Sequence, residues 1–319
     1  MAPTAIEIPT SDGKKLLGTL YTPSLAPPPY GMPHKLPALV LAPTFTATQL
    51  MGSQNWAKHF THHLWLAVIT FDSRGFGLSA SAGEPHEVLP QVQLSDLQDV
   101  ITFASSHSLI DPAKIALWGS GLSGGHVLHV AAVDKRVKAV ISQTPMVNGW
   151  VTLGRRVRYD EMPNIIARFA EDRVNRCGGG VPEYIPVVSS VSAETCALPG
   201  AESFAHFNVV RKMGGGEGGG KGEAKDEWVN KVTLRSMEAI RAYVPEALIE
   251  RISPTPLLMV VARDDRVCGA DLALKAYQRA LEPKEVRIVE AGHYSVYTGE
   301  KFEGLVEGEV QWLKSVLGL

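Results

Sequence analysis

The most informative stretch of this sequence reads Lys114-Ile-Ala-Leu-Trp-Gly-Ser-Gly-Leu-Ser-Gly-Gly-His126. Its apolar first half predicts a short buried strand over Lys114–Trp118. The glycines that follow predict a sharp turn, because a residue without a β-carbon tolerates positive φ angles and close backbone approach. His126 and His129 then fall on a helix, where we expect them to pack. The stretch therefore predicts a strand, a tight turn and a helix in direct succession.

Short apolar runs recur on both sides of this stretch. They lie at Pro37–Ala42, Leu66–Phe71, Val137–Ser142, Pro256–Val261 and, more weakly, Val286–Val289. Because helical patterns separate these runs, they predict a mostly parallel sheet covered on both faces, a doubly wound α/β architecture. Ahead of them, residues 5–22 alternate around Asp12-Gly13, which predicts an antiparallel hairpin.

Residues 149–251 differ in character from the rest of the chain. Helical patterns cover Leu153–Arg176 and Thr233–Tyr243, residues 177–200 are rich in Gly, Pro and Ser, and the glycine-rich residues 213–222 predict a mobile loop. We interpret this segment as a helical lid inserted between two parts of an α/β core, residues 1–148 and 252–319. Such insertions shape pockets over strand ends. The aromatic candidates for lining one are Trp150, Tyr159, Phe169 and Tyr184.

The glycine-dense turn suggests a nucleophile elbow, the G-x-S-x-G pattern that exposes a serine hydroxyl at the end of a sheet. Two registers compete. Counting from Gly119 places Gly121 where the serine should be, whereas counting from Gly121 gives a formal match with Ser123 as the nucleophile. Ser123 would lie in the first helical turn, rotated by roughly 200° from the elbow position. We therefore expect Ser123 to pack or cap, and Ser120 is a weaker candidate still.

Several segments resemble the α/β hydrolases related to dienelactone hydrolase and to fungal polyketide transferases. Members typically carry W-G-[ST]-S-x-S-G-G-H at the elbow, and this chain has Trp-Gly-Ser-Gly-Leu-Ser-Gly-Gly-His over residues 118–126. The resemblance continues at residues 71–79, 134–140, 142–145, 230–236 and 274–283. It implies the α/β-hydrolase fold and places the family's catalytic serine at Gly121.

The resemblance also assigns an acid and a histidine. Family spacing puts the acid at Asp265, with Asp264 as a competitor that we expect to be solvated, and the base at His293 in Glu290-Ala-Gly-His-Tyr294. The chain order of nucleophile, acid and histidine is that of α/β hydrolases. A carboxylate bonded to an imidazole fixes its tautomer and stabilises the imidazolium. Such a pair can therefore act as a base without a serine.

The loop after residue 42 departs from the family. Members usually have His-Gly before an aromatic residue there, and this chain has Pro43-Thr44-Phe45. Proline has no amide hydrogen, but Phe45 can still donate its own, and Leu122 would supply the second donor of an oxyanion hole. We expect this altered hole to persist, with Thr44 among the substrate-binding residues.

Composition excludes several classes of function. The chain has 319 residues, 45% of them hydrophobic, and a formal net charge of -2, so it lacks the basic footprint of a nucleic-acid-binding protein. Its cysteines, Cys177, Cys196 and Cys268, are too scattered for a disulfide framework or a zinc motif.

We expect a cytoplasmic protein that has no membrane span, no cofactor and no metal, and that takes a small hydrophobic substrate. Whether it forms a homodimer stays open. We expect His62-His63 to be solvated or to cap a helix, and Arg74 to be structural.

Three functions of different classes remain open. In the first, which we favour, His293 held by Asp265 removes a proton next to a carbonyl and promotes an aldol, Knoevenagel or similar cyclisation. In the second, the chain is an ester or thioester hydrolase or an acyltransferase that uses Ser123, or a serine that Gly121 replaces. In the third, it is a non-catalytic ligand-binding protein. The resemblance implies fungal secondary metabolism and a polyketide or polyketide–amino-acid substrate, as in the Knoevenagel closure of cytochalasan-type clusters.

Overall fold

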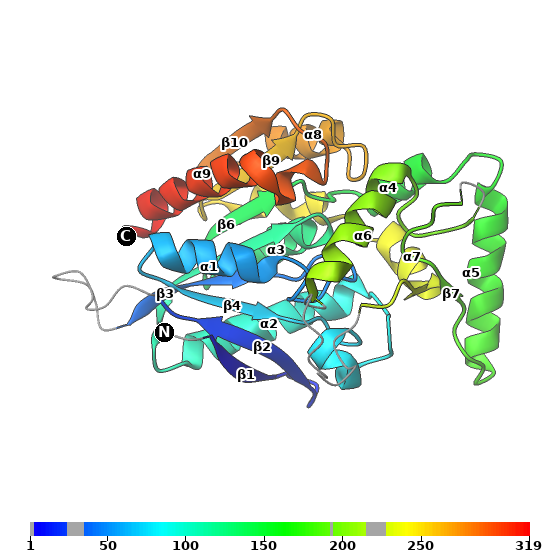
Figure 1. The fold of residues 1–319 in the computed structure, drawn as a ribbon, viewed down its shortest axis with the longest axis horizontal. Helices are drawn as coiled ribbons and strands as arrows, with labels where there is room; N and C mark the ends of the chain where they lie inside the picture. The colour runs from blue at the N-terminus through cyan, green and yellow to red at the C-terminus, as the bar shows by residue number, and fades with distance from the viewer. Residues whose placement is uncertain (1–2, 24–34, 192–193, 215–227) are drawn as a thin grey trace.

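The central element of the computed structural model is an eight-stranded sheet in the order β1-β2-β4-β3-β5-β6-β9-β10 (Figure 1). The structure describes residues 3–23, 35–191, 194–214 and 228–319. The strands are β1 (Thr4–Pro9), β2 (Lys15–Tyr21), β3 (Leu36–Leu41), β4 (Ala67–Phe71), β5 (Ile110–Ser120), β6 (Val137–Gln143), β9 (Leu257–Ala262) and β10 (Lys284–Val289). β1, β2 and β4 pair antiparallel, and the remaining pairs are parallel. The predicted α/β-hydrolase fold is confirmed.

Helices cover both faces of the sheet, because its central strands are apolar on both sides. In β3, Ala38 and Val40 pack into the core shared with α2 (Pro90–Ser106), α3 (Leu122–Val133) and α8 (Ala270–Arg279). The alternate residues Leu39 and Leu41 pack into the core shared with α1 (Ser53–His63) and α9 (Gly299–Leu317). This alternation is what a doubly wound architecture requires.

The opening hairpin forms where the sequence predicted it. Pro9 pairs with Lys15 across the turn, and Gly13 has a φ of 80°, a conformation that glycine adopts without strain. Arg74 ties this hairpin to α2, because it donates to Asp12 and forms an ion pair with the buried carboxylate of Asp96. Its role is therefore structural, as expected.

The insertion after β6 forms a helical layer at one end of the sheet (Figure 1). Its elements are α4 (Gly149–Arg156), α5 (Met162–Cys177), β7 (Tyr184–Ile185), α6 (Ala201–Gly214), β8 (Val232–Thr233), α7 (Leu234–Arg241) and the 3₁₀ helix η2 (Pro245–Ile252). We call the layer formed by α4 to α7 the lid. The division into residues 1–148, 149–251 and 252–319 stays a prediction.

The lid differs in detail from the sequence prediction. The helical pattern over Leu153–Arg176 is formed by two helices, because the chain leaves the helix at Val157 and restarts at Met162, with a proline in the new first turn. The helix α6 and the small β7–β8 sheet had not been predicted. Most of the predicted glycine-rich loop over residues 213–222 lies outside the described residues.

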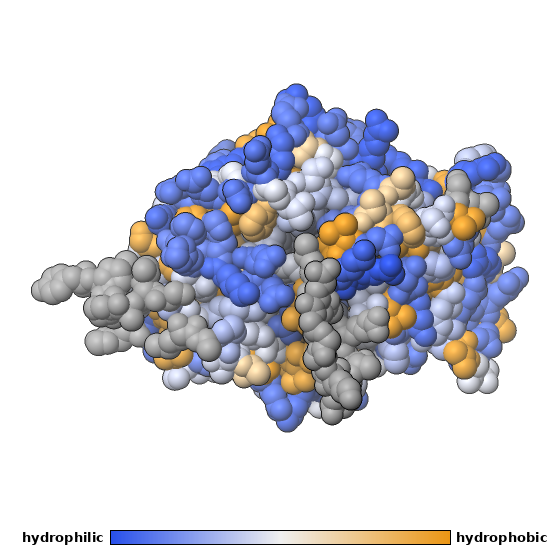
Figure 2. Space-filling view, viewed as in Figure 1, coloured by the Kyte–Doolittle hydropathy of each residue, from blue (hydrophilic) through white to orange (hydrophobic). Residues whose placement is uncertain are grey.

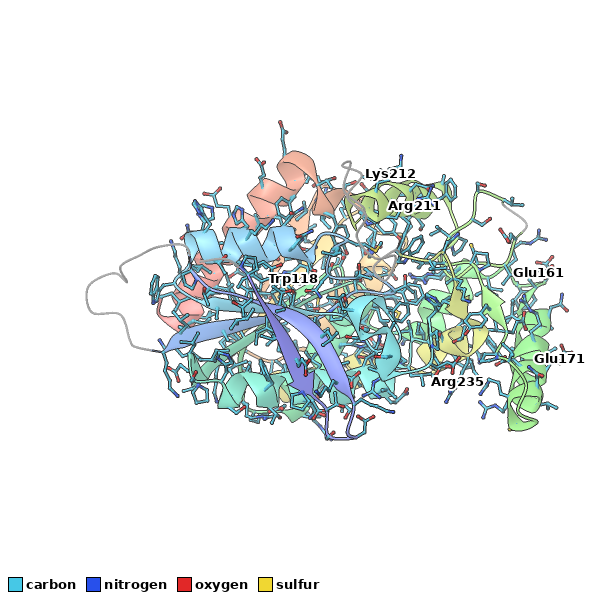
Figure 3. The ribbon with its side chains drawn as sticks, turned by 60° about the horizontal axis from the view of Figure 1, so that its bottom comes forward. Trp118, Glu161, Glu171, Arg211, Lys212 and Arg235 are labelled. Atoms are coloured by element: carbon cyan, nitrogen blue, oxygen red, sulfur yellow. The ribbon has the colours of Figure 1, made fainter. Side chains whose placement is uncertain are left out.

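Several charged side chains of the lid lie on its outer surface. Glu161 at the start of α5, Glu171 within α5, and Arg211 and Lys212 near the end of α6 are exposed, whereas Trp118 of β5 is buried (Figure 3). The face shown in Figure 2 is mainly hydrophilic, with apolar side chains in small scattered groups. Within the described part of the chain, no helix combines the length and apolar character needed to cross a membrane.

Candidate active site

The turn between β5 and α3 has the geometry of a nucleophile elbow. Gly121 occupies it with φ 60° and ψ -122°, outside the regions that residues with a β-carbon favour. The flanking glycines are sterically required: a β-carbon on Gly119 would collide with the carbonyl oxygen of Ser123, and one on Gly125 with that of Met146. The predicted strand, turn and helix are therefore confirmed.

Gly121 faces the histidine across the cavity. A β-carbon built on Gly121 would lie 3.2 Å from Oγ1 of Thr44 and 3.8 Å from Nε2 of His293. The position thus has the orientation of a nucleophile without the reactive group.

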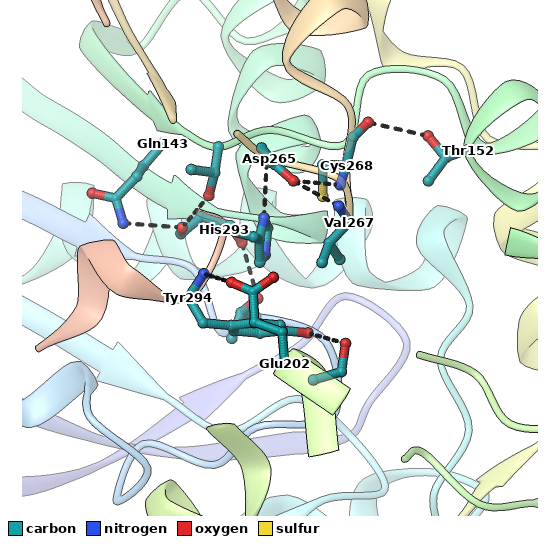
Figure 4. A network of polar contacts seen from close by, with 12 residues as sticks. Gln143, Thr152, Glu202, Asp265, Val267, Cys268, His293 and Tyr294 are labelled. Carbon is teal, nitrogen blue, oxygen red and sulfur yellow. Dashed lines mark hydrogen bonds and ion pairs between the residues drawn. The ribbon is translucent and has the colours of Figure 1, made fainter. Parts of the chain in front are cut away.

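Asp265 and His293 form a buried pair (Figure 4). Oδ2 of Asp265 lies 2.9 Å from Nδ1 of His293. The other carboxylate oxygen, Oδ1, accepts hydrogen bonds from the amides of Val267 and Cys268, both at 2.8 Å, which fixes the carboxylate. Asp264 is exposed. The carboxylate that meets the imidazole is therefore the one that family spacing indicated.

The environment of this pair favours the charged forms. Burial raises the pKa of Asp265, but the neighbouring imidazole and the two amide donors outweigh burial and hold that pKa below its usual value. Burial likewise lowers the pKa of His293, but the Asp265 carboxylate, together with the neighbouring Cys268, outweighs burial, so the pKa of His293 lies well above its usual value. A raised pKa makes the imidazole a stronger proton acceptor.

Ser123 does not contact the histidine. Its hydroxyl donates to the carbonyl oxygen of Ser120 at 2.9 Å and accepts from the Ser120 amide at 3.0 Å, and the side chain is fully buried. These bonds tie the first turn of α3 to the end of β5. The side chain of Ser120 instead lies 2.6 Å from the hydroxyl of Tyr297. Both serines thus hold the elbow together.

Two amides remain available for an oxyanion. Phe45 and Leu122 line the same cavity as Gly121, and within the described residues neither amide donates to a protein acceptor. Thr44 also lines the cavity and donates its hydroxyl hydrogen to the carbonyl oxygen of Ser120 at 2.9 Å. The Pro43-Thr44-Phe45 segment is thus compatible with an oxyanion hole.

The cavity lies between the carboxyl ends of the strands and the lid. From the lid it is lined by Arg156, Leu198, His206, Phe207, Val210, Met237 and Ile240. On the core side the cavity is also lined by aromatic residues of α1, β5 and α9, namely Trp56, Trp118 and Phe302. This mostly apolar lining with a few polar groups is typical of pockets for hydrophobic small molecules.

The aromatic residues predicted to line the cavity lie elsewhere, so that prediction is wrong. Trp150 is 58% exposed and stacks beneath the Arg241 guanidinium, and Tyr159 is 96% exposed. The hydroxyl of Tyr184 points to Glu84 and Pro85, outside the cavity. Phe169 is buried within α5. Trp150 and Tyr184 are instead held by contacts on the outside of the lid, with Arg241 and with Glu84 and Pro85.

Sequence reasoning missed the thiol of Cys268. The carboxylate of Asp265, the thiol of Cys268 and the imidazole of His293 bring one donor atom each within 4.8 Å of one another. Among the described residues, this is the group that could share a metal ion, and its O, S and N donors are of a kind that zinc accepts. However, Oδ2 of Asp265 and Nδ1 of His293 already bond to each other. Cys268 lies only three residues after Asp265 in the chain, and this closeness to the predicted acid was the sequence signal that could have identified it.

The histidines set aside from the sequence have structural surroundings. His126 is buried, with Nδ1 3.0 Å from the hydroxyl of Tyr243 and Nε2 3.0 Å from Oε1 of Gln93. His62 and His63 are exposed in the last turn of α1.

Comparison with known proteins identifies the family. Residues 37–300 match the model of the alpha/beta hydrolase fold family. The chain therefore belongs to the α/β-hydrolase fold family, as its sheet order and elbow indicate.

Individual relatives extend the likeness over the whole chain. The chain is 26% identical over 316 residues to a thiohydrolase of Eupenicillium brefeldianum, which covers 98% of this chain and 94% of that protein. It is 25% identical to polyketide transferase claH of Penicillium crustosum, over 98% of this chain and 97% of that protein. Among solved structures, the alpha/beta hydrolase GrgF from Penicillium sp. sh18 aligns over 100% of both chains with a TM-score of 0.82 and 25% identity.

Proposed function

We propose that this protein is a biosynthetic enzyme that uses His293 and Asp265 as a general base for a cyclisation forming a carbon–carbon bond. The observation that carries the proposal is an intact acid–histidine pair whose free nitrogen faces a glycine at the nucleophile position. The relatives named thiohydrolase and polyketide transferase support a role in fungal secondary metabolism. The apolar cavity suits a polyketide or polyketide–amino-acid substrate.

The chemistry suits a β-keto amide that carries an aldehyde. Nε2 of His293 takes the proton from the carbon between the two carbonyls, and the electron pair passes to a carbonyl oxygen. The amides of Phe45 and Leu122 stabilise this enolate. The carbon then attacks the aldehyde carbon, the new alkoxide takes the proton back from the imidazolium, and loss of water completes a Knoevenagel condensation. An aldol reaction stops before the loss of water.

Hydrolysis through an acyl-enzyme is disfavoured. In this fold it needs a nucleophilic side chain at the elbow, facing the histidine, and Gly121 supplies none. Ser123, the alternative nucleophile, is bonded to the backbone of Ser120 and fully buried. A purely ligand-binding role would leave the buried Asp265–His293 pair without a use.

The test is the cyclisation of such a substrate by wild type and by His293→Ala. We expect the variant to cyclise roughly 10²-fold more slowly or worse, the scale of a general-base contribution, with nearly unchanged substrate affinity. His129→Ala is the matched control, because His129 lies on α3 and does not line the cavity. If cyclisation by His293→Ala equals that of wild type, the proposal fails and only binding remains.

A further inference from the structure

A second imidazole enters the cavity from the lid. His206 lies on α6 and lines the cavity together with Gly121 and His293. Its ring stacks on that of Tyr294, with centroids 4.3 Å apart and an interplanar angle of 21°. Tyr294 in turn meets His293 edge to face at 4.8 Å. The Tyr294 ring therefore fixes the position of His206 relative to the proposed base.

Two further contacts anchor α6 at this point. The hydroxyl of Tyr294 donates to Oγ of Ser203 at 3.2 Å, and its amide donates to Oε1 of Glu202 at 3.4 Å (Figure 4). Ser203 and His206 are three residues apart and so lie on the same face of the helix. The docking of α6 thus holds His206 in a defined place at the cavity wall.

The ring nitrogens of His206 are free to bind a substrate. Within the described residues, no hydrogen bond or ion pair to them is formed. Burial, helped by the nearby His293, lowers the pKa of His206 to about 4. The ring is therefore neutral near pH 7 and presents one N–H donor. A phenylalanine would stack on Tyr294 equally well without placing unpaired polar atoms in an apolar wall, so packing alone does not account for a histidine.

We propose that His206 is a second catalytic residue, whose N–H donates a hydrogen bond to the aldehyde oxygen while His293 removes the proton. A neutral imidazole can polarise a carbonyl in this way, and His206 gains or loses no proton. The proposal rests on the proposed function and deepens it. It assigns the two reacting groups of the substrate to different walls, with the enolate at the elbow and the aldehyde at the lid.

The first test is spectroscopic and needs no turnover. The probe is a β-keto amide aldehyde with two methyl groups on the carbon between the carbonyls, so that no proton can be removed, and with ¹³C at the aldehyde. We expect its infrared C=O frequency to be lower when bound to wild type than when bound to His206→Phe. His206→Gln, which retains an N–H donor, should restore part of the shift. His129→Phe is the control for an imidazole outside the cavity.

The second test is kinetic. Loss of one preorganised donor typically costs about 10²–10³ in rate. His206→Phe should therefore cyclise the unmethylated substrate, which still has a removable proton, that much more slowly. If His206→Phe leaves both the frequency and the rate unchanged, His206 is a packing residue and this inference fails alone, provided that His293→Ala still slows cyclisation as the proposed function expects. If His293→Ala has no effect, the proposed function fails, and the infrared shift still decides whether His206 binds the aldehyde.

Discussion

Gly121 and His293 face each other with a gap of 3.8 Å between the place of a β-carbon and Nε2 of the imidazole. A serine at position 121 would point its hydroxyl into that gap. The elbow and the acid–histidine pair are both in place. Of the serine, histidine and aspartate of a serine hydrolase the site therefore lacks only the serine, and this difference can be reversed experimentally.

Gly121→Ser is expected to create weak hydrolysis of a p-nitrophenyl ester without improving cyclisation. The new hydroxyl would complete a serine–histidine–aspartate arrangement, and the Phe45 and Leu122 amides would stabilise the oxyanion. The φ of 60° at this position should also cost about 1–3 kcal/mol in the free energy of unfolding. Gly121→Ala is the matched control, because it has the same backbone strain without the hydroxyl. Equal ester turnover by the two variants would contradict the prediction.

Ser123→Ala is expected to lower stability and to leave catalysis nearly unchanged. Its hydroxyl accepts from the buried amide of Ser120, and an amide left unpaired costs about 1–3 kcal/mol. Urea unfolding and cyclisation rates, measured on the same preparation, separate the two effects. Strong ester turnover by the wild type that Ser123→Ala abolishes would instead identify Ser123 as a nucleophile.

The pH dependence of cyclisation should follow His293. The base must be unprotonated, and Asp265 raises the pKa of His293, so the wild-type rate should rise with pH and reach half its maximum above pH 6.5, the ordinary value for histidine. In Asp265→Asn the carboxylate charge is lost and burial dominates. The midpoint should therefore move to lower pH, and the plateau should fall because the imidazole is no longer held in the correct tautomer. A midpoint that stays in place would show that another group controls the rate.

Glu309 should make the fold less stable as the pH rises. It is fully buried, its Oε2 accepts from Nε1 of Trp118 at 3.1 Å, and burial raises its pKa from 4.5 to about 8. Between these values the unfolded chain releases a proton that the folded protein keeps, so unfolding becomes easier by up to about 1.4 kcal/mol per pH unit. Glu309→Gln removes this dependence, and its stability relative to wild type should rise from pH 4.5 to 8. If the urea midpoints of wild type and Glu309→Gln change in parallel over that pH range, the assignment is refuted.

Substrate affinity should depend on Phe207 and not on Tyr159. Phe207 lines the cavity from the lid, whereas Tyr159 is almost fully exposed. Phe207→Ala should raise KM for the cyclisable substrate by roughly tenfold or more, since burial of an aromatic ring is worth well over 1.4 kcal/mol. Tyr159→Ala should leave KM at the wild-type value. The reverse result would place the substrate on the outer face of the lid.

The sequence alone determined the sheet and the elbow, and its resemblance to a known family identified the acid and the histidine. These features are local: an apolar run forms a buried strand, glycines permit the turn at Gly121, and Asp265 and His293 each follow directly after a strand. Because each of these residues follows a strand in the sequence, each lies at the carboxyl end of the sheet. The absence of a side chain at position 121 is likewise visible without coordinates.

The tertiary structure alone decided what lies opposite that turn. The lid helices have apolar residues on more than one face, so their boundaries and rotation depend on docking, and the sequence placed Trp150, Tyr159 and Tyr184 in the cavity wrongly. Contact with Tyr294, 88 residues away in the chain, brings His206 into the site, and the turn after Asp265 brings Cys268 beside His293. Such pairings are set by how separate elements pack, and no local periodicity encodes them.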